Sequence, residues 1–171
     1  MAPAEQLKSE FGSTTYAQFA ALHLAALAVN EGKLPDAEAQ LRWVLGKAEK
    51  GSDIAQVAQL RLARVLAASG ATDQALAILA AAQAGTYGAS YAAARGDILL
   101  AAGRNDEARD AYTQAVASAG GDEEVNLPAL QQKLQSLTPV PARTVGATVP
   151  PAPGAADAAA ATNDTVDAPE E

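Results

Sequence analysis

Few side chains in this sequence are suited to acid–base or nucleophilic chemistry. His23 is the single histidine, and it lies in the apolar stretch AALHLAAL. The chain has no cysteine, which excludes disulfides, thiolate metal sites and cysteine nucleophiles. Without a second histidine or a thiol, His23 can complete neither a catalytic triad nor a metal site. We therefore interpret His23 as a packed or groove-lining residue and not as a catalyst.

Two further segments could carry chemistry, but both fit structural roles better. Asp122, Glu123 and Glu124 lie together beside glycines in a predicted turn. An acidic cluster at a helix N-terminus is stabilised by the helix macrodipole, and we favour this role over a general acid and base. The segment GTYGASY (85–91) lacks the spacing and the lysine of a phosphate-binding loop. The sequence therefore predicts no enzyme, no bound cofactor and no metal site.

An internal repeat predicts the elements that position the remaining side chains. In each copy a small residue stands seven residues before a glycine, an alanine follows the glycine by five residues, and a bulkier apolar residue follows the alanine by four. The copies are Ala25, Gly32, Ala37 and Leu41; Ala63, Gly70, Ala75 and Leu79; and Gly96, Gly103, Ala108 and Tyr112. The glycines are 38 and then 33 residues apart, which brackets the 34-residue period of a tetratricopeptide repeat.

The repeat predicts helix-turn-helix pairs in which the small residues mark close contacts. Glycine would end the first helix of each pair, and the alanine would lie where the second helix crosses the first. Ser52, Thr72 and Asn105 are the expected N-caps of helices that follow a break. A last helix, at about 125–137, presents four leucines on one face: Leu127, Leu130, Leu134 and Leu137.

We accordingly predict an all-α fold, a tetratricopeptide-like solenoid of three helix-turn-helix pairs plus a C-terminal capping helix. The alternative is an irregular alanine-rich bundle, since alanine makes up 45 of the 171 residues. Three regions follow from the patterning: a flexible N-terminal segment (1–14), the helical domain (15–137) and a disordered, Pro/Ala-rich acidic tail (138–171). The tail has no aromatic residue, and we expect it to bury too little apolar area to offset the cost of ordering.

Charge and hydropathy argue against nucleic acid as a partner and against a membrane-spanning segment in this sequence. The net charge is −8, of which residues 1–137 and the tail each carry −4, and this argues against a nucleic-acid surface. No apolar run reaches the roughly 18 residues that a membrane span needs. The first ten residues also lack the apolar core of a signal peptide.

The remaining candidate is a protein-binding groove on the concave face of the solenoid, which the first helices of the pairs would line. Helical spacing places a mixture of apolar and charged side chains there: Phe19, Leu22, His23, Leu60, Arg61, Arg64, Asp97 and Leu100. Such a groove suits an extended or helical peptide segment. An equally favoured interpretation is that Arg61, Arg64 and Asp97 pair across adjacent helices and hold the stack together.

Residues 15–137 resemble a known family over three quoted stretches. LRLARV (60–65), RGDILL (95–100) and the short leucine-containing last helix occur in the order found in the periplasmic domain of the YfgM family, the ancillary subunit of the SecYEG translocon in Gram-negative bacteria. Members of that family carry one N-terminal membrane anchor ahead of this domain. Here Met1 leads directly into APAEQLKSEFGSTTY, so we expect the anchor to have been removed. The Pro/Ala tail departs from the compact ending of the family.

The resemblance implies a non-enzymatic interaction module that links secreted-protein translocation to periplasmic chaperones. Its implied partners are the SecYEG translocon, a PpiD-like membrane-anchored chaperone and, more generally, protein or peptide segments. Its implied location is the periplasmic side of the bacterial inner membrane, with membrane contact only through the anchor. The alternative function is a generic tetratricopeptide scaffold that assembles a cytoplasmic or envelope complex and meets no unfolded clients.

Overall fold

The computed structural model describes residues 6, 10–12, 14–82, 85–121 and 125–137, and the regular elements of this part are all helices. Its α-helices are α2 (Thr15–Asn30), α3 (Leu34–Lys47), α4 (Asp53–Ala68), α5 (Thr72–Ala81), α6 (Gly88–Ala101), α7 (Asn105–Ser118) and α8 (Leu127–Leu137). Two short 3₁₀ helices, Gly85–Tyr87 and Ala119–Gly121, flank the third pair. The predicted all-α fold is confirmed.

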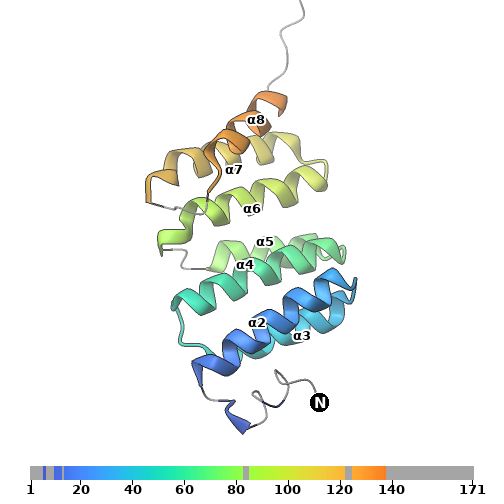
Figure 1. Ribbon diagram of the computed structural model, residues 1–171. Helices are drawn as coiled ribbons and strands as arrows, with labels where there is room; N and C mark the ends of the chain where they lie inside the picture. The colour runs from blue at the N-terminus through green and yellow to red at the C-terminus, as the bar shows by residue number, and fades with distance from the viewer. Residues whose placement is uncertain (1–5, 7–9, 13, 83–84, 122–124, 138–171) are drawn as a thin grey trace, which may run out of the picture. The chain divides into compact units, whose positions relative to one another are not determined.

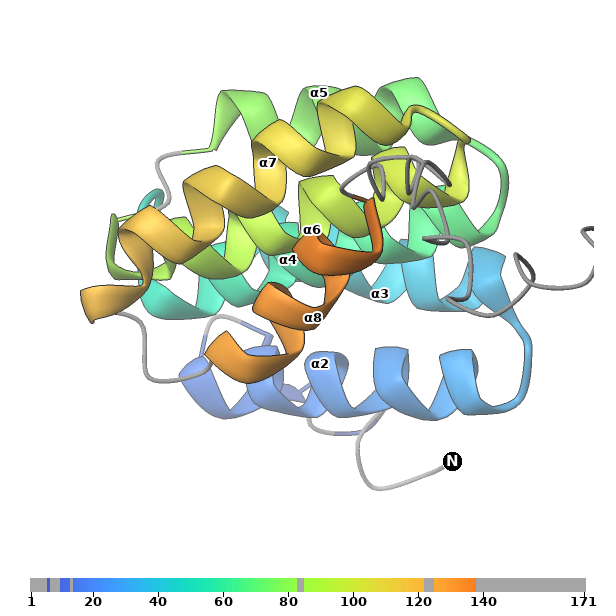
Figure 2. The same ribbon diagram turned by 90° about the horizontal axis from the view of Figure 1, so that it is seen from above.

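The helices form three antiparallel pairs, α2/α3, α4/α5 and α6/α7, which lie in successive layers with α8 against the last (Figure 1). Each pair also contacts the next, because α4 packs on both α2 and α3, and α6 packs on both α4 and α5. Seen along the stack, α8 runs at an angle to the other helices (Figure 2). The predicted solenoid of three pairs and a capping helix is therefore confirmed.

The turn within each pair is a Schellman motif. In the first pair the amide of Gly32 donates to the carbonyl of Val29 (3.0 Å), and the amide of Lys33 donates to the carbonyl of Ala28 (2.8 Å). Gly32 takes a left-handed conformation, with φ of 73°, which favours a residue without a Cβ. The carbonyl of Lys33 then accepts from the amide of Ala37 and begins α3. The same bonds recur around Gly70 and Gly103.

These turns correct two of the three predicted N-caps. Ser52 does cap α4, because its hydroxyl accepts from the amide of Ala55 at 3.3 Å. Thr72 and Asn105, however, are the first helical residues of α5 and α7, and the caps are Ala71 and Arg104. The physical reason is the Schellman turn, in which the residue after the glycine both ends one helix and begins the next. Its backbone therefore occupies the cap position, and no capping side chain is used.

The small and bulky residues of the repeat meet inside each pair. The three alanines that follow the glycines are fully buried, as are Leu41 and Tyr112. In the third pair the bulky residue is an aromatic ring, and Gly96 takes the place that Ala25 and Ala63 hold in the others. A Cβ built on Gly96 would lie 2.5 Å from Cε1 of Tyr112. The larger ring therefore requires the smaller residue opposite it.

A buried tyrosine joins the second and third pairs. The hydroxyl of Tyr91, on α6, donates to the backbone carbonyl of Gln56 on α4 at 2.7 Å and lies 3.1 Å from Oε1 of Gln59. Burial raises the pKa of Tyr91 to about 12. The contact satisfies the hydroxyl inside the interface between two pairs, as a buried phenol requires.

The predicted domain boundaries are only partly covered by the described residues. Thr14 caps α2 through its hydroxyl, which accepts from the amide of Ala17 at 3.3 Å. The helices from α2 to α8 run from Thr15 to Leu137, and the bounds of the predicted helical domain (15–137) remain a prediction. The predicted disordered tail (138–171) and the acidic cluster at 122–124 lie outside the described residues, so both remain predictions.

Candidate functional site

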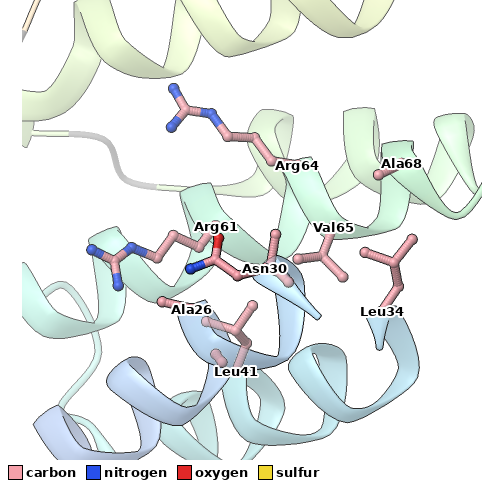
Figure 3. Close-up of a pocket in the computed structure, with 10 residues that line it drawn as sticks. Ala26, Asn30, Leu34, Leu41, Arg61, Arg64, Val65 and Ala68 are labelled. Atoms are coloured by element: carbon pink, nitrogen blue, oxygen red, sulfur yellow. The ribbon is translucent and has the colours of Figure 1, made fainter. Parts of the chain in front are cut away.

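A cleft of about 260 Å³ lies between the first pair and α4. Its walls are mostly apolar, and its rim carries two arginines from α4 (Figure 3). The lining residues are Ala25, Ala26, Val29, Asn30, Leu34, Leu41, Arg61, Arg64, Val65 and Ala68. In Figure 3 the guanidinium groups of Arg61 and Arg64 point away from Val65 and Leu34. The cleft thus combines an apolar interior with a cationic edge.

A second cleft, of about 500 Å³, continues along the same two first helices. It is lined by Phe19, Leu22, His23, Ala26, Asp53, Ile54, Val57, Arg61 and Tyr87. Ala26 and Arg61 line both clefts, so the two form one surface, which we call the α2/α4 groove. The groove follows α4 from its first turn to its last.

The two groove arginines differ from three of the other arginines in the described part of the chain. Two of these arginines hold an ion pair within their own helix, Arg42 with Glu38 and Arg109 with Asp106. The third, Arg104, is the N-cap of α7 and pairs with Glu107 of that helix. Arg61 and Arg64 are exposed, and within the described part of the chain neither has an ion-pair or hydrogen-bond partner. The pairing of Arg61 and Arg64 with adjacent helices, which we considered from the sequence, is therefore not found among these residues.

Four predicted groove residues, Phe19, His23, Arg61 and Arg64, are solvent-exposed and line the groove. Leu22 also lines it, but as part of its floor, since only 6% of the residue is exposed. Leu60 requires a correction. It lies on the inner side of α4, within the core that joins the first two pairs. Successive residues of a helix point in different directions, so Leu60 faces the core while Arg61 faces the groove.

Asp97 and Leu100 of α6 also require a correction, because they belong to the packing of the capping helix. Asp97 Oδ1 accepts from the hydroxyl of Tyr112 at 2.6 Å and is paired with the ammonium of Lys133 on α8. Lys133 Nζ also lies 5.4 Å from the centre of the Tyr112 ring, within cation–π range. Burial, and then the hydrogen bond to Asp97, raise the pKa of Tyr112. Leu100 packs partly buried in the cluster beneath α8.

The cross-helix pairing expected of Asp97 is thus real, but its partner is a lysine of the cap. Figure 1 shows why sequence spacing alone misassigns it, since α8 lies against the last pair. Lys133 of α8 contacts Asp97 of α6 at that end of the stack. The two clefts described above lie along α2 and α4.

Sequence reasoning missed several residues that line the groove. Leu34 and Leu41 come from the second helix of the first pair, and Tyr87 comes from the short 3₁₀ segment before α6. The prediction considered the first helices alone, so contributions from turns and second helices were left out. The position of Leu34 in the repeat could have indicated its role. It lies two residues after Gly32, at the first residue of α3 after the turn.

The chemistry of the groove suits the binding of a protein segment. Among the described residues, no group of three or more His, Asp or Glu side chains could hold a metal ion. Within the same residues, no helix is both long enough and apolar enough to cross a bilayer. Burial of apolar side chains in the groove would supply affinity, and the planar guanidinium groups can hold carboxylates in two-bond geometry.

Comparison with known proteins gives one family. The sequence model of one protein family, the tetratricopeptide repeat-like domain, matches residues 1–139, which is most of the chain. Searches among curated proteins and among solved structures found no match. Domains of this kind generally act as non-enzymatic scaffolds for protein interaction. The helix pairs, the repeat spacing and this match agree, and the chain belongs to the family of tetratricopeptide repeat-like domains.

Proposed function

We propose that this tetratricopeptide repeat-like domain is the periplasmic part of an ancillary translocon subunit that passes newly translocated chains to periplasmic chaperones. The α2/α4 groove is the observation that carries the proposal, because it offers a protein segment an apolar cleft and two arginines that have no ion-pair partner among the described residues. The sequence resemblance to the YfgM family supplies the finer assignment. Under this proposal the domain holds partners and clients and performs no chemistry.

The partners in this proposal are the SecYEG channel and a PpiD-like membrane-anchored chaperone, and the location is the periplasmic side of the inner membrane. An exposed apolar and aromatic surface on α2 supports a role in holding protein segments. Phe19 is 56% exposed and Tyr16 is 77% exposed, and α2 carries no Asp, Glu, Lys or Arg. Depletion of charge and enrichment of aromatic residues are typical of the centres of protein interfaces.

Capture of a chaperone tests the proposal. The purified PpiD-like chaperone is immobilised and its binding of the wild-type domain is compared with that of the Arg61→Ala, Arg64→Ala double variant. We expect the double variant to bind more weakly with its helix content kept, because neither arginine holds an ion pair within the described part of the chain. The control is Asp110→Ala, an exposed charge on the second helix α7, which should change neither quantity.

Circular dichroism on the same samples separates the outcomes. A joint fall of affinity and helix content would assign the arginines a structural role. Unchanged affinity in a folded double variant would mean that the chaperone binds elsewhere, for example at the leucines of α8.

The scaffold alternative makes a different prediction about the gene. An apolar stretch of about 20 residues encoded upstream of Met1 would support an anchored periplasmic domain, since that is the length of a membrane-spanning helix. A gene without such a stretch would favour a scaffold that assembles a complex without clients. Reading the upstream sequence therefore distinguishes the two functions before any protein is made.

A further inference from the structure

The α2/α4 groove is electrically asymmetric along its length. Arg61 and Arg64 lie in the second half of α4, at the apolar cleft, whereas Asp53 lines the groove at the first turn of the same helix. From Asp53 to Ala68, α4 is about 22 Å long at 1.5 Å per residue. An extended chain rises about 3.3 Å per residue, so the groove matches a segment of about six or seven residues.

The cationic half of the groove stands out against an acidic domain. Residues 1–137 carry a net charge of −4. Apart from Arg61 and Arg64, the groove is lined by one carboxylate, Asp53, by His23 and by uncharged residues. Two guanidinium groups three residues apart on one helix are complementary to one or two carboxylates. They are too few to neutralise the phosphates of a nucleic acid on a chain of this charge.

The cleft beside the arginines can take a side chain. Its volume is about 260 Å³, and it adjoins the second cleft, of about 500 Å³, at Ala26 and Arg61. Its walls include Leu41 and Val65, so the fitting group is aliphatic. An aliphatic side chain and a neighbouring carboxylate on one backbone would use both features together.

We propose that the groove binds an extended partner segment in which a carboxylate lies at Arg61 and Arg64 and an aliphatic side chain next to it enters the cleft lined by Leu41 and Val65. This inference rests on the proposed function, since it describes the segment that the groove of the interaction module accepts. The carboxylate can accept bidentate bonds from a guanidinium, which a lysine could not offer in the same geometry. Asp53, at the opposite end, disfavours a second acidic residue there and so orients the segment.

Binding of two matched peptides tests the inference. The probe is a fluorescein-labelled heptapeptide, Leu-Ala-Leu-Asp-Leu-Ala-Leu, capped at both ends, and its counterpart has asparagine in place of the aspartate. Fluorescence anisotropy gives the dissociation constant of each with the full chain. We expect the aspartate peptide to bind about 3- to 10-fold more tightly, which is the range for one or two solvent-accessible ion pairs.

The preference should disappear in the Arg61→Gln, Arg64→Gln variant and persist in Arg42→Gln. Arg42 is the matched control, because it is an exposed arginine on α3 that lines neither cleft. If the double glutamine variant loses helix content, the Arg61→Lys, Arg64→Lys variant replaces it. That variant keeps both charges, and its preference should be smaller than that of the wild type because the bidentate geometry is lost.

Three results would overturn the inference: equal affinity for the two peptides, a preference that survives in the folded glutamine variant, and no binding of either peptide. None of these depends on the chaperone. If the chaperone is captured through Arg61 and Arg64 while the two peptides bind equally, the proposed function stands and the carboxylate specificity is refuted. If the peptides behave as expected while no chaperone is captured, the groove specificity stands and the translocon role is refuted.

Discussion

Replacement of Gly96 by alanine should destabilise the domain, although alanine is the better helix former. The new Cβ would lie 2.5 Å from Cε1, 2.6 Å from Cδ1 and 2.9 Å from Cζ of Tyr112. Carbon atoms in contact are normally about 3.5–4.0 Å apart, so the ring must move by about 1 Å. Tyr112 is fully buried and its hydroxyl is bound to Asp97 at 2.6 Å, so little room is available for that movement.

The magnitude follows from three opposing contributions. Overpacking of a core costs about 1–3 kcal/mol, and loss of a hydrogen bond to a charged group costs about 1.5–3 kcal/mol. The gain in helix propensity from glycine to alanine is about 1 kcal/mol. The net expectation is a loss of about 1.5–5 kcal/mol in the free energy of unfolding. At about 4 °C per kcal/mol, the midpoint of thermal unfolding should fall by about 6–20 °C.

Thermal unfolding followed by circular dichroism measures this change, and a double variant identifies its cause. Gly96→Ala with Tyr112→Leu recreates the alanine and leucine combination of the other two pairs, Ala25 with Leu41 and Ala63 with Leu79. The double variant should be more stable than the sum of the two single changes predicts, because the clash needs both partners. A Gly96→Ala variant that is stabilised by about 1 kcal/mol would refute the reasoning, since propensity alone would then decide the outcome.

Three further perturbations test other parts of the domain. Ala108→Leu should lower the free energy of unfolding by about 1–3 kcal/mol in chemical denaturation, because Ala108 is fully buried at a helix crossing. An unchanged denaturation midpoint would show that the site can expand. Deletion of residues 139–171 should leave helix content and the thermal midpoint nearly unchanged, since that sequence predicts no packed core, and a loss of cooperativity would show that the tail docks. The free energy of unfolding should fall as the pH rises from 10 to 12. Burial raises the pKa of Tyr91 to about 12 in the folded chain, against an ordinary 10.0, so the Tyr91 hydroxyl ionises at lower pH in the unfolded chain than in the folded one. Urea titrations should show a smaller fall over this range for Tyr91→Phe, and an equal fall would assign the effect to other groups.

The repeat could be predicted from the sequence because its physical requirements are local. Gly32, Gly70 and Gly103 need a left-handed backbone, and the alanines five residues later need a close helix crossing, so the residue types report the geometry directly. The caps at Ala71 and Arg104 could not be predicted in the same way. There the backbone of the Schellman turn provides the cap, and the side chain leaves no signature in the sequence.

The candidate site was predictable only where one helix determines it. Phe19, His23, Arg61 and Arg64 could be placed on exposed faces from helical periodicity alone. The environment of Asp97 depends on Lys133, which is 36 residues away in the sequence and reaches it only because α8 packs on the third pair. Leu60 was placed wrongly because α4 packs between the first and third pairs. A helix with neighbours on two sides buries more of its side chains than a helix packed on one side.

The Schellman turn also determines where the solenoid can change length. Because one residue ends the first helix and begins the second, an inserted residue at that point would break both sets of hydrogen bonds at once. The unequal spacing of the glycines, 38 and then 33 residues, is accordingly absorbed elsewhere. Thus α3 has 14 residues and α5 has 10, while the turns within the pairs are identical. Loop grafts and length variants should therefore be tolerated between the pairs and rejected within them.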